Sequence, residues 1–207
     1  MGPVNYSFDR GDVHILVLDN IVHQGKSETS CKEELCERVM EWARTDLSAV
    51  PKEKTVVVCM HAGLEYAAAQ ELYEILAGFN YARLIGGHSH YIHYAIEKVA
   101  GKTINMDDVG TTNGVDWCAT VCGGGEPMGY ASYEFEDGKL YHPADFPEFE
   151  YQVKSDKPRI YKFDVPGNDY VVANIWNATT EWSFEVWEDG VKVSDALVQK
   201  KIYDVWS

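Results

Sequence analysis

Two short apolar segments, each followed by glycine and histidine, constrain this chain most. Residues 55–60, Thr-Val-Val-Val-Cys-Met, have the composition of a strand buried on both faces, and His61 comes directly after them. Residues 84–87, Leu-Ile-Gly-Gly, lead in the same way into His88 and His90. Because the carboxyl ends of parallel strands meet at one edge of a sheet, the three histidines are predicted to lie at a single rim.

These histidines form a candidate metal site. His88 and His90 are two residues apart, so on an extended segment both imidazoles point the same way. Gly87, just before them, lets the backbone turn and approach a ligand closely. A single histidine is more often a hydrogen-bonded structural residue than a ligand, and that alternative applies to His61 taken alone. The three together favour a site for Zn, Mn or Fe.

Helices and strands are predicted to alternate before the second motif. The apolar run at 13–18 indicates a buried strand, and apolar residues at helical spacing predict helices at 30–47 and 65–77. Ser30 and Glu33 have the spacing of a capping box at the start of the first helix. Strand, helix, strand, helix, strand is typical of an α/β layered unit with parallel strands.

Three residues near this rim are candidates for a substrate pocket. Asn20 and His23 follow the strand at 13–18, in the loop that leaves its carboxyl end, and Gly87 opens the histidine turn. His14 lies inside that strand and is predicted to be structural rather than functional.

The two histidine motifs resemble those of the calcineurin-like metallophosphoesterases. In that family a strand ends in histidine, as at Met60-His61, and a Gly-His-x-His turn follows, as at 87–90. The opening of the chain, residues 6–19, is similar to a strand pair of the family. The run 117–130 is similar to the subgroup that carries an additional C-terminal domain. The resemblance covers most of the chain and is specific at the histidine motifs.

This resemblance implies a hydrolase of phosphoric esters, either phosphomonoesters or phosphodiesters, that uses two divalent metal ions. Matched to the motifs of the family, His61 and His88 are ligands of one ion and His90 is a ligand of the other. No Gly-Asn-His, the family motif with the catalytic histidine, occurs in the sequence, and Gly11-Asp12 lies in a predicted hairpin turn, the wrong place for the bridging aspartate. We therefore expect the second half of a family member, without a catalytic residue of its own, with partial or no metal occupancy and inactive in isolation.

The expected fold has two parts. Residues 1–145 are predicted to form an incomplete α/β layered metallophosphoesterase-type sandwich that lacks its N-terminal half. Residues 146–207 are predicted to form a small all-β sandwich-like domain, shorter than the roughly 100 residues usual for a sandwich. The proline-containing segment 142–158 is predicted to be the linker. Four short strands are expected after it, at 159–165, 170–176, 182–187 and 191–193.

Tryptophans in the second part leave another function open. Trp176, Trp182, Trp187 and Trp206 form either the core of this domain or a face on which carbohydrate stacks, and the burial habits of aromatic residues favour the core. The alternative function is thus a non-catalytic carbohydrate- or protein-binding module that uses the aromatic-rich β domain.

Charge narrows the range of partners. The formal net charge of -15 argues against nucleic acid or an anionic membrane surface, and no apolar run is long enough to span a membrane. A small phosphate ester is still an expected partner because a metal pair supplies local positive charge. A sheet surface left uncovered by the missing half is expected to promote self-association.

The cysteines and the family resemblance are the two features that relate to the cellular compartment of the protein. Five cysteines, an odd number without a paired spacing, predict unpaired thiols. For localisation the resemblance implies only that proteins of this subgroup are often exported, for instance to the periplasm.

Overall fold

The structure is a computed structural model, and both histidine motifs lie within the residues that it describes. The described residues are 2–25, 30–63, 70–113, 122, 128–136, 139–140, 159–162, 171–174, 183 and 185–194.

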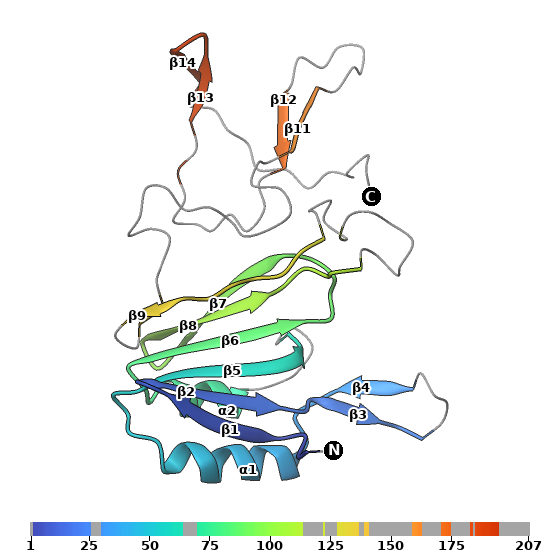
Figure 1. Ribbon diagram of the computed structural model, residues 1–207, viewed down its shortest axis with the longest axis vertical. Coiled ribbons are helices and arrows are strands. Elements are labelled where there is room, and N and C mark those ends of the chain that lie inside the picture. Colours follow the sequence, from blue (N-terminus) through green and yellow to red (C-terminus); the bar gives the residue numbers. More distant parts are fainter. Residues whose placement is uncertain are drawn as a thin grey trace.

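A six-stranded mixed sheet organises the first half of the chain (Figure 1). In spatial order its strands are β1 (Tyr6–Arg10), β2 (Val13–Leu18), β5 (Thr55–Ala62), β6 (Tyr81–Gly87), β8 (Lys102–Asp108) and β7 (His93–Val99). The four inner strands are mutually parallel, and the two outer strands are antiparallel to their neighbours. The carboxyl ends of β2, β5, β6 and β8 therefore share one edge of the sheet, as the sequence predicted for the first three.

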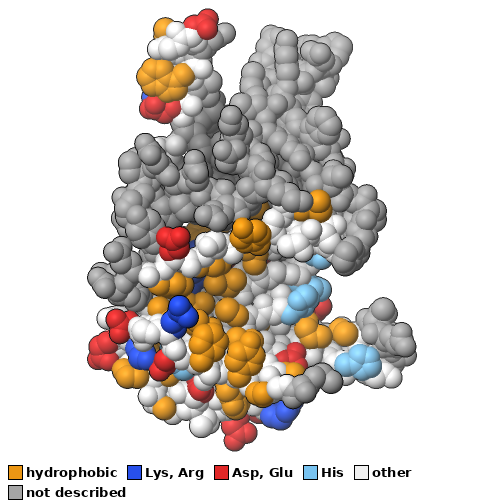
Figure 2. All heavy atoms as spheres, in the orientation of Figure 1, with side chains coloured by type: hydrophobic (Ala, Val, Ile, Leu, Met, Phe, Trp, Pro, Cys, Tyr) orange, Lys and Arg blue, Asp and Glu red, His pale blue; other side chains and the backbone are white. Residues whose placement is uncertain are grey.

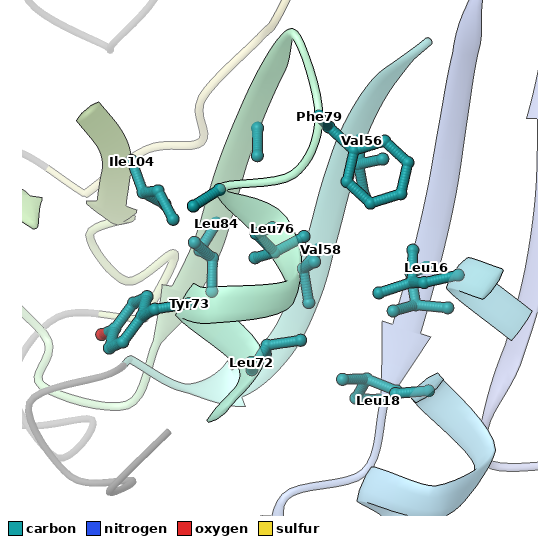
Figure 3. Close-up of a cluster of buried hydrophobic side chains, with 14 of the residues drawn as sticks. Leu16, Leu18, Val56, Val58, Leu72, Tyr73, Leu76, Phe79, Leu84 and Ile104 are labelled. Carbon is teal, nitrogen blue, oxygen red and sulfur yellow. The ribbon is translucent and has the colours of Figure 1, made fainter. Parts of the chain in front are cut away.

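Two helices, α1 (Glu37–Ser48) and α2 (Gln70–Leu76), pack on one face of this sheet. The alternation of side chains puts Leu16, Val58 and Leu84 of neighbouring strands on that face, where all three are at most 2% exposed. Figure 3 shows Leu72 and Leu76 of α2 beside these strand residues, with Phe79 at the far end of the cluster. Burial of this apolar cluster is the main stabilising contribution to the α/β layer.

The first helix begins seven residues later than predicted. Residues Cys31–Glu33 form β4, which pairs with β3 (Ile21–His23) in an antiparallel hairpin, and Cys36 caps α1 without a side-chain hydrogen bond. The predicted capping box of Ser30 and Glu33 is thus wrong. The hairpin supplies the backbone hydrogen bonds that a helical turn would have supplied. For example, the Gln24 N–H donates to the Ser30 carbonyl at 2.8 Å.

The opposite face of the sheet is apolar over its first strands and carries a buried ion pair further on. Figure 2 shows hydrophobic side chains gathered over β1, β2, β5 and β6. Beyond them, the Arg83 guanidinium on β6 donates to both carboxylate oxygens of Asp107 on β8, at 2.5 and 2.7 Å, and both side chains are only 7% exposed. Burial alone lowers the pKa of the Arg83 guanidinium, but the hydrogen bonds and negative charge of Asp107, together with Tyr81, raise this pKa by more than burial lowers it.

We expect Arg83→Met to destabilise the chain by about 3–5 kcal/mol, because it leaves the Asp107 carboxylate buried without its counter-charge. The double variant Arg83→Met/Asp107→Leu should recover most of that loss, since it removes both buried charges. Urea denaturation measures both free energies of unfolding. Equal stabilities for the single and double variants would contradict the assignment.

His14 is held in a polar network at the other edge of the sheet. Its Nδ1 lies 2.7 Å from Asp9 Oδ1 and its Nε2 lies 2.8 Å from Asp46 Oδ2, while Lys54 Nζ lies 2.8 Å from Asp9 Oδ2. Since the His14 side chain is only 7% exposed, these contacts give it the structural position that the sequence predicted.

Asp9→Asn should lower stability at neutral pH only. The hydrogen bonds from Lys54 and then His14 hold the pKa of Asp9 below its ordinary value of 3.8. A depressed carboxyl pKa stabilises the fold above the unfolded-state pKa, and this contribution disappears as the pH falls through the lower folded-state pKa. Because Asp9 is exposed, the difference from the natural chain should be under about 1 kcal/mol near about pH 7, and urea titrations should show it vanishing near about pH 2. A difference that grows in acid would contradict this.

The described strands after β8 form three separate two-stranded sheets. They are β9 (Phe135–Glu136) with β10 (Lys139–Leu140), β11 (Arg159–Lys162) with β12 (Val171–Asn174), and β13 (Val186–Glu188) with β14 (Val191–Ser194). The expected β-sandwich and the boundary at 145 stay predictions. Trp187 lies on β13 and is 57% exposed, whereas Trp176, Trp182 and Trp206 fall outside the described residues.

Neither helix in the described part of the chain is long and apolar enough to cross a membrane.

Candidate metal centre

Two of the three predicted histidines meet at the rim formed by the strand ends. His61 lies near the end of β5, and His88 directly follows β6, the neighbouring strand. His61 Nε2 lies 3.1 Å from His88 Nδ1, and the rings meet edge to face with centroids 5.1 Å apart. Parallel pairing of β5 and β6 thus brings together residues that are 27 positions apart in the sequence.

The spacing of these nitrogens suits two ligands of one metal ion. Imidazole nitrogens bind zinc at about 2.0–2.1 Å, so two of them in adjacent tetrahedral or octahedral positions lie about 2.9–3.4 Å apart. The 3.1 Å between His61 and His88 falls within that interval. Among the residues that the structure describes, no three His, Cys, Asp or Glu side chains come together as a group that would hold an ion. The pair is therefore at most a candidate half-site, with two of the ligands that an ion would need.

The histidine turn is not extended, which corrects the prediction for His88 and His90. The strand ends at Gly87, and both histidines have positive φ, 70° and 60°. The Ser89 N–H donates to the Gly87 carbonyl at 2.8 Å, across His88. This hydrogen bond, with the φ of His88, is that of a classic γ-turn, a rare and strained conformation. Such strain in residues other than glycine clusters at functional sites.

Electrostatics at the rim favour a neutral His61. Partial burial lowers the pKa of its imidazole, and the neighbouring rings of His88 and His90 lower it further, while Glu33 acts in the opposite direction. Neutral imidazole is the form that binds metal. His90, the third predicted ligand, is half-buried and influences His61 through its charge.

Asn20, a predicted pocket residue, instead joins two strands at the rim. Its side chain is fully buried, its amide nitrogen donates to the Ala62 carbonyl at 2.8 Å, and its amide oxygen accepts from the Ala62 N–H at 3.2 Å. Because Ala62 directly follows His61, this pair of hydrogen bonds fixes the position of the backbone that carries the imidazole. His23 is exposed on β3 and Gly87 lies at the turn, where their contact with substrate stays a prediction.

Glycine lets β5, β6 and β8 approach one another beside the histidines. The buried Asp108 carboxylate, at the end of β8, occupies the space that a side chain on Gly63 would fill. A Cβ on Gly86 would come within 2.9 Å of Gly63 Cα. The rim is therefore packed tightly, backbone against carboxylate.

We expect Gly63→Ala to destabilise the chain by about 1–3 kcal/mol, because the new methyl group overlaps the Asp108 carboxylate. Gly87→Ala is the matched control, since a Cβ there meets its nearest atom, the Val109 carbonyl oxygen, at 3.6 Å. Thermal and urea denaturation of both variants measure the difference. Equal loss in the two variants would contradict the packing described.

Sequence reasoning missed one rim residue. Glu33, assigned to a helix cap, lies on β4, and its Oε1 is 3.4 Å from His88 Nε2. The available signal was the β-branched pair Ile21 and Val22, followed by Gly25 as a turn residue, which permits a hairpin.

One Asp-x-His triplet, which is a ligand spacing in the family that the motifs resemble, lies away from the rim. Asp12-Val13-His14 stands at the amino end of β2, where Val13 is paired with Thr55, the first residue of β5. Since His61 is near the other end of β5, the triplet and the histidine pair lie at opposite edges of the sheet.

Residues 108–205 match a family model described as the C terminal of calcineurin-like phosphoesterase. This match supports the family that the histidine motifs resemble, and it lies on a different part of the chain from those motifs. Neither a curated protein nor a solved structure matches the chain.

Proposed function

We propose that this chain, which carries the C-terminal domain of the calcineurin-like phosphoesterases, takes part in the metal-dependent hydrolysis of phosphoric esters. Two independent regions support the proposal: the family match at 108–205 and the histidine pair at the sheet rim. The observation that carries it is the 3.1 Å between His61 Nε2 and His88 Nδ1, a separation that suits two ligands of one cation.

The roles of the histidines follow from their places on the rim. His61 and His88 would hold one divalent ion through Nε2 and Nδ1, respectively, and His90 would belong to a second ion. When bound, a metal pair polarises phosphoryl oxygens and activates water. The chain contributes a fixed backbone: Asn20 anchors the strand residue next to His61, and the γ-turn aims His88. Zn, Mn and Fe all suit such a site.

Binding by the isolated chain is expected to be weak. Neutral imidazoles supply no negative charge to balance two divalent cations, and the described residues offer no third ligand beside the pair. We therefore expect no measurable hydrolysis of a chromogenic phosphodiester by the isolated chain, even with zinc or manganese added.

Zinc titration tests the half-site. His61→Ala and His88→Ala should each weaken zinc binding by more than about tenfold, because even the loss of a residue that only orients a ligand costs about 10–100-fold. His23→Ala is the matched control, since this exposed histidine on the neighbouring hairpin should leave the affinity unchanged. Isothermal titration calorimetry gives the dissociation constants.

One outcome would contradict the proposal, and a second would contradict only the expected inactivity. Equal zinc affinity in the natural chain and in His88→Ala would remove the half-site. Turnover of the phosphodiester by the isolated chain that disappears in His88→Ala would keep the metal site but overturn the expected inactivity.

A further inference from the structure

The inference concerns Glu33, a carboxylate that reaches the histidine pair from outside the sheet. Glu33 is the last residue of β4, on the hairpin that projects from the end of β2 (Figure 1). Its Oε1 lies 3.4 Å from His88 Nε2, and the two side chains are 29% and 37% exposed. Its charge also acts on His61, where it opposes the lowering of the pKa by burial.

The two nitrogens of the His88 ring face different partners. Nδ1 lies 3.1 Å from His61 Nε2, and Nε2 lies 3.4 Å from Glu33 Oε1. A neutral imidazole carries its proton on only one nitrogen, and a hydrogen bond at one nitrogen decides the state of the other. A carboxylate accepts but does not donate, so Glu33 favours the proton on Nε2 and leaves the lone pair on Nδ1.

Backbone contacts hold Glu33 in place relative to the rim. The N–H of the next residue, Glu34, donates to the Asn20 carbonyl at 2.8 Å. The side chain of that same Asn20 bonds to Ala62, the neighbour of His61. The hairpin that carries Glu33 and the strand that carries His61 are thus fixed to one buried residue.

We propose that Glu33 is a positioning residue, which holds His88 in the tautomer whose Nδ1 would be free to bind a metal ion. The inference rests on the proposed function, because the half-site of His61 and His88 must bind metal for the tautomer to matter there. A separation of 3.4 Å is longer than an ordinary hydrogen bond. We expect it to shorten when metal binds, as catalytic hydrogen bonds often do when substrate binds. Metal-binding histidines commonly donate their second N–H to a carboxylate in this way.

The first measurement is the tautomer itself, in the metal-free chain. Imidazole ¹⁵N spectra, recorded at a pH where the histidines are neutral, distinguish protonated from unprotonated Nδ1 and Nε2. Glu33→Ala should shift the His88 population away from the Nε2–H form, and Glu33→Gln, which keeps an acceptor oxygen, should restore much of it. An unchanged His88 tautomer in Glu33→Ala would overturn the proposal.

The second measurement is zinc affinity by calorimetry. Glu33→Ala should weaken binding of zinc alone by about 10–100-fold, with a smaller loss in Glu33→Gln. Glu34→Ala is the matched control, because Glu34 is the adjacent carboxylate and pairs with Lys32 at 2.6 Å, and its removal should leave the affinity unchanged. Amide spectra of each variant show whether the sheet is intact. Glu33→Met, which has a similar volume but no oxygen acceptor, replaces Glu33→Ala if the latter does not fold.

The outcomes separate this inference from the proposed function. Loss of zinc binding in His88→Ala, with unchanged binding and tautomer in Glu33→Ala, would overturn the role of Glu33 and leave the half-site in place. Unchanged binding in His88→Ala would overturn the half-site, and with it the positioning role.

Discussion

Parallel pairing of β2, β5, β6 and β8 is the constraint on which the rest of this structure depends. It brings the carboxyl ends of these four strands to one edge of the sheet. The strands are mostly apolar and buried, so the polar residues lie where the strands end, at this edge. His61 and His88 are far apart in the sequence, so no local turn or helix brings them together. Their meeting is a consequence of register, in which Cys59 pairs with Ile85 and the two strands end almost level.

Close packing fixes the positions of the strand ends at this shared edge. Gly63 and Gly86 allow Asp108 to approach the strand ends, and Asn20 fastens β2 to β5 through both groups of its amide. Each of these contacts is buried, so none is exchanged easily for water. Both imidazoles are exposed, yet buried hydrogen bonds of Asn20 hold the backbone next to His61.

Strands and rim could be predicted from the sequence because continuous apolar runs bounded by glycine and histidine have few alternatives. The start of the first helix could not be predicted, because residues 31–33 hydrogen-bond in a hairpin with residues 21–23, and local sequence does not reveal this pairing. The extended conformation expected for His88 failed for a different reason: positive φ is rare outside glycine, and no residue pattern announces it. Glu33 was misplaced along with the hairpin that carries it.

The β3–β4 hairpin has a consequence for how this site responds to perturbation. A two-stranded ribbon contributes little cooperative stability of its own, and its three-residue strands stand apart from the six-stranded sheet. Opening of the ribbon would separate a carboxylate from its imidazole without melting the hydrophobic layer. We therefore expect two levels of order at the rim: a rigid one set by the sheet, and a softer one in the hairpin, whose strands can open and re-form beyond the anchor at Asn20 while the protein stays folded.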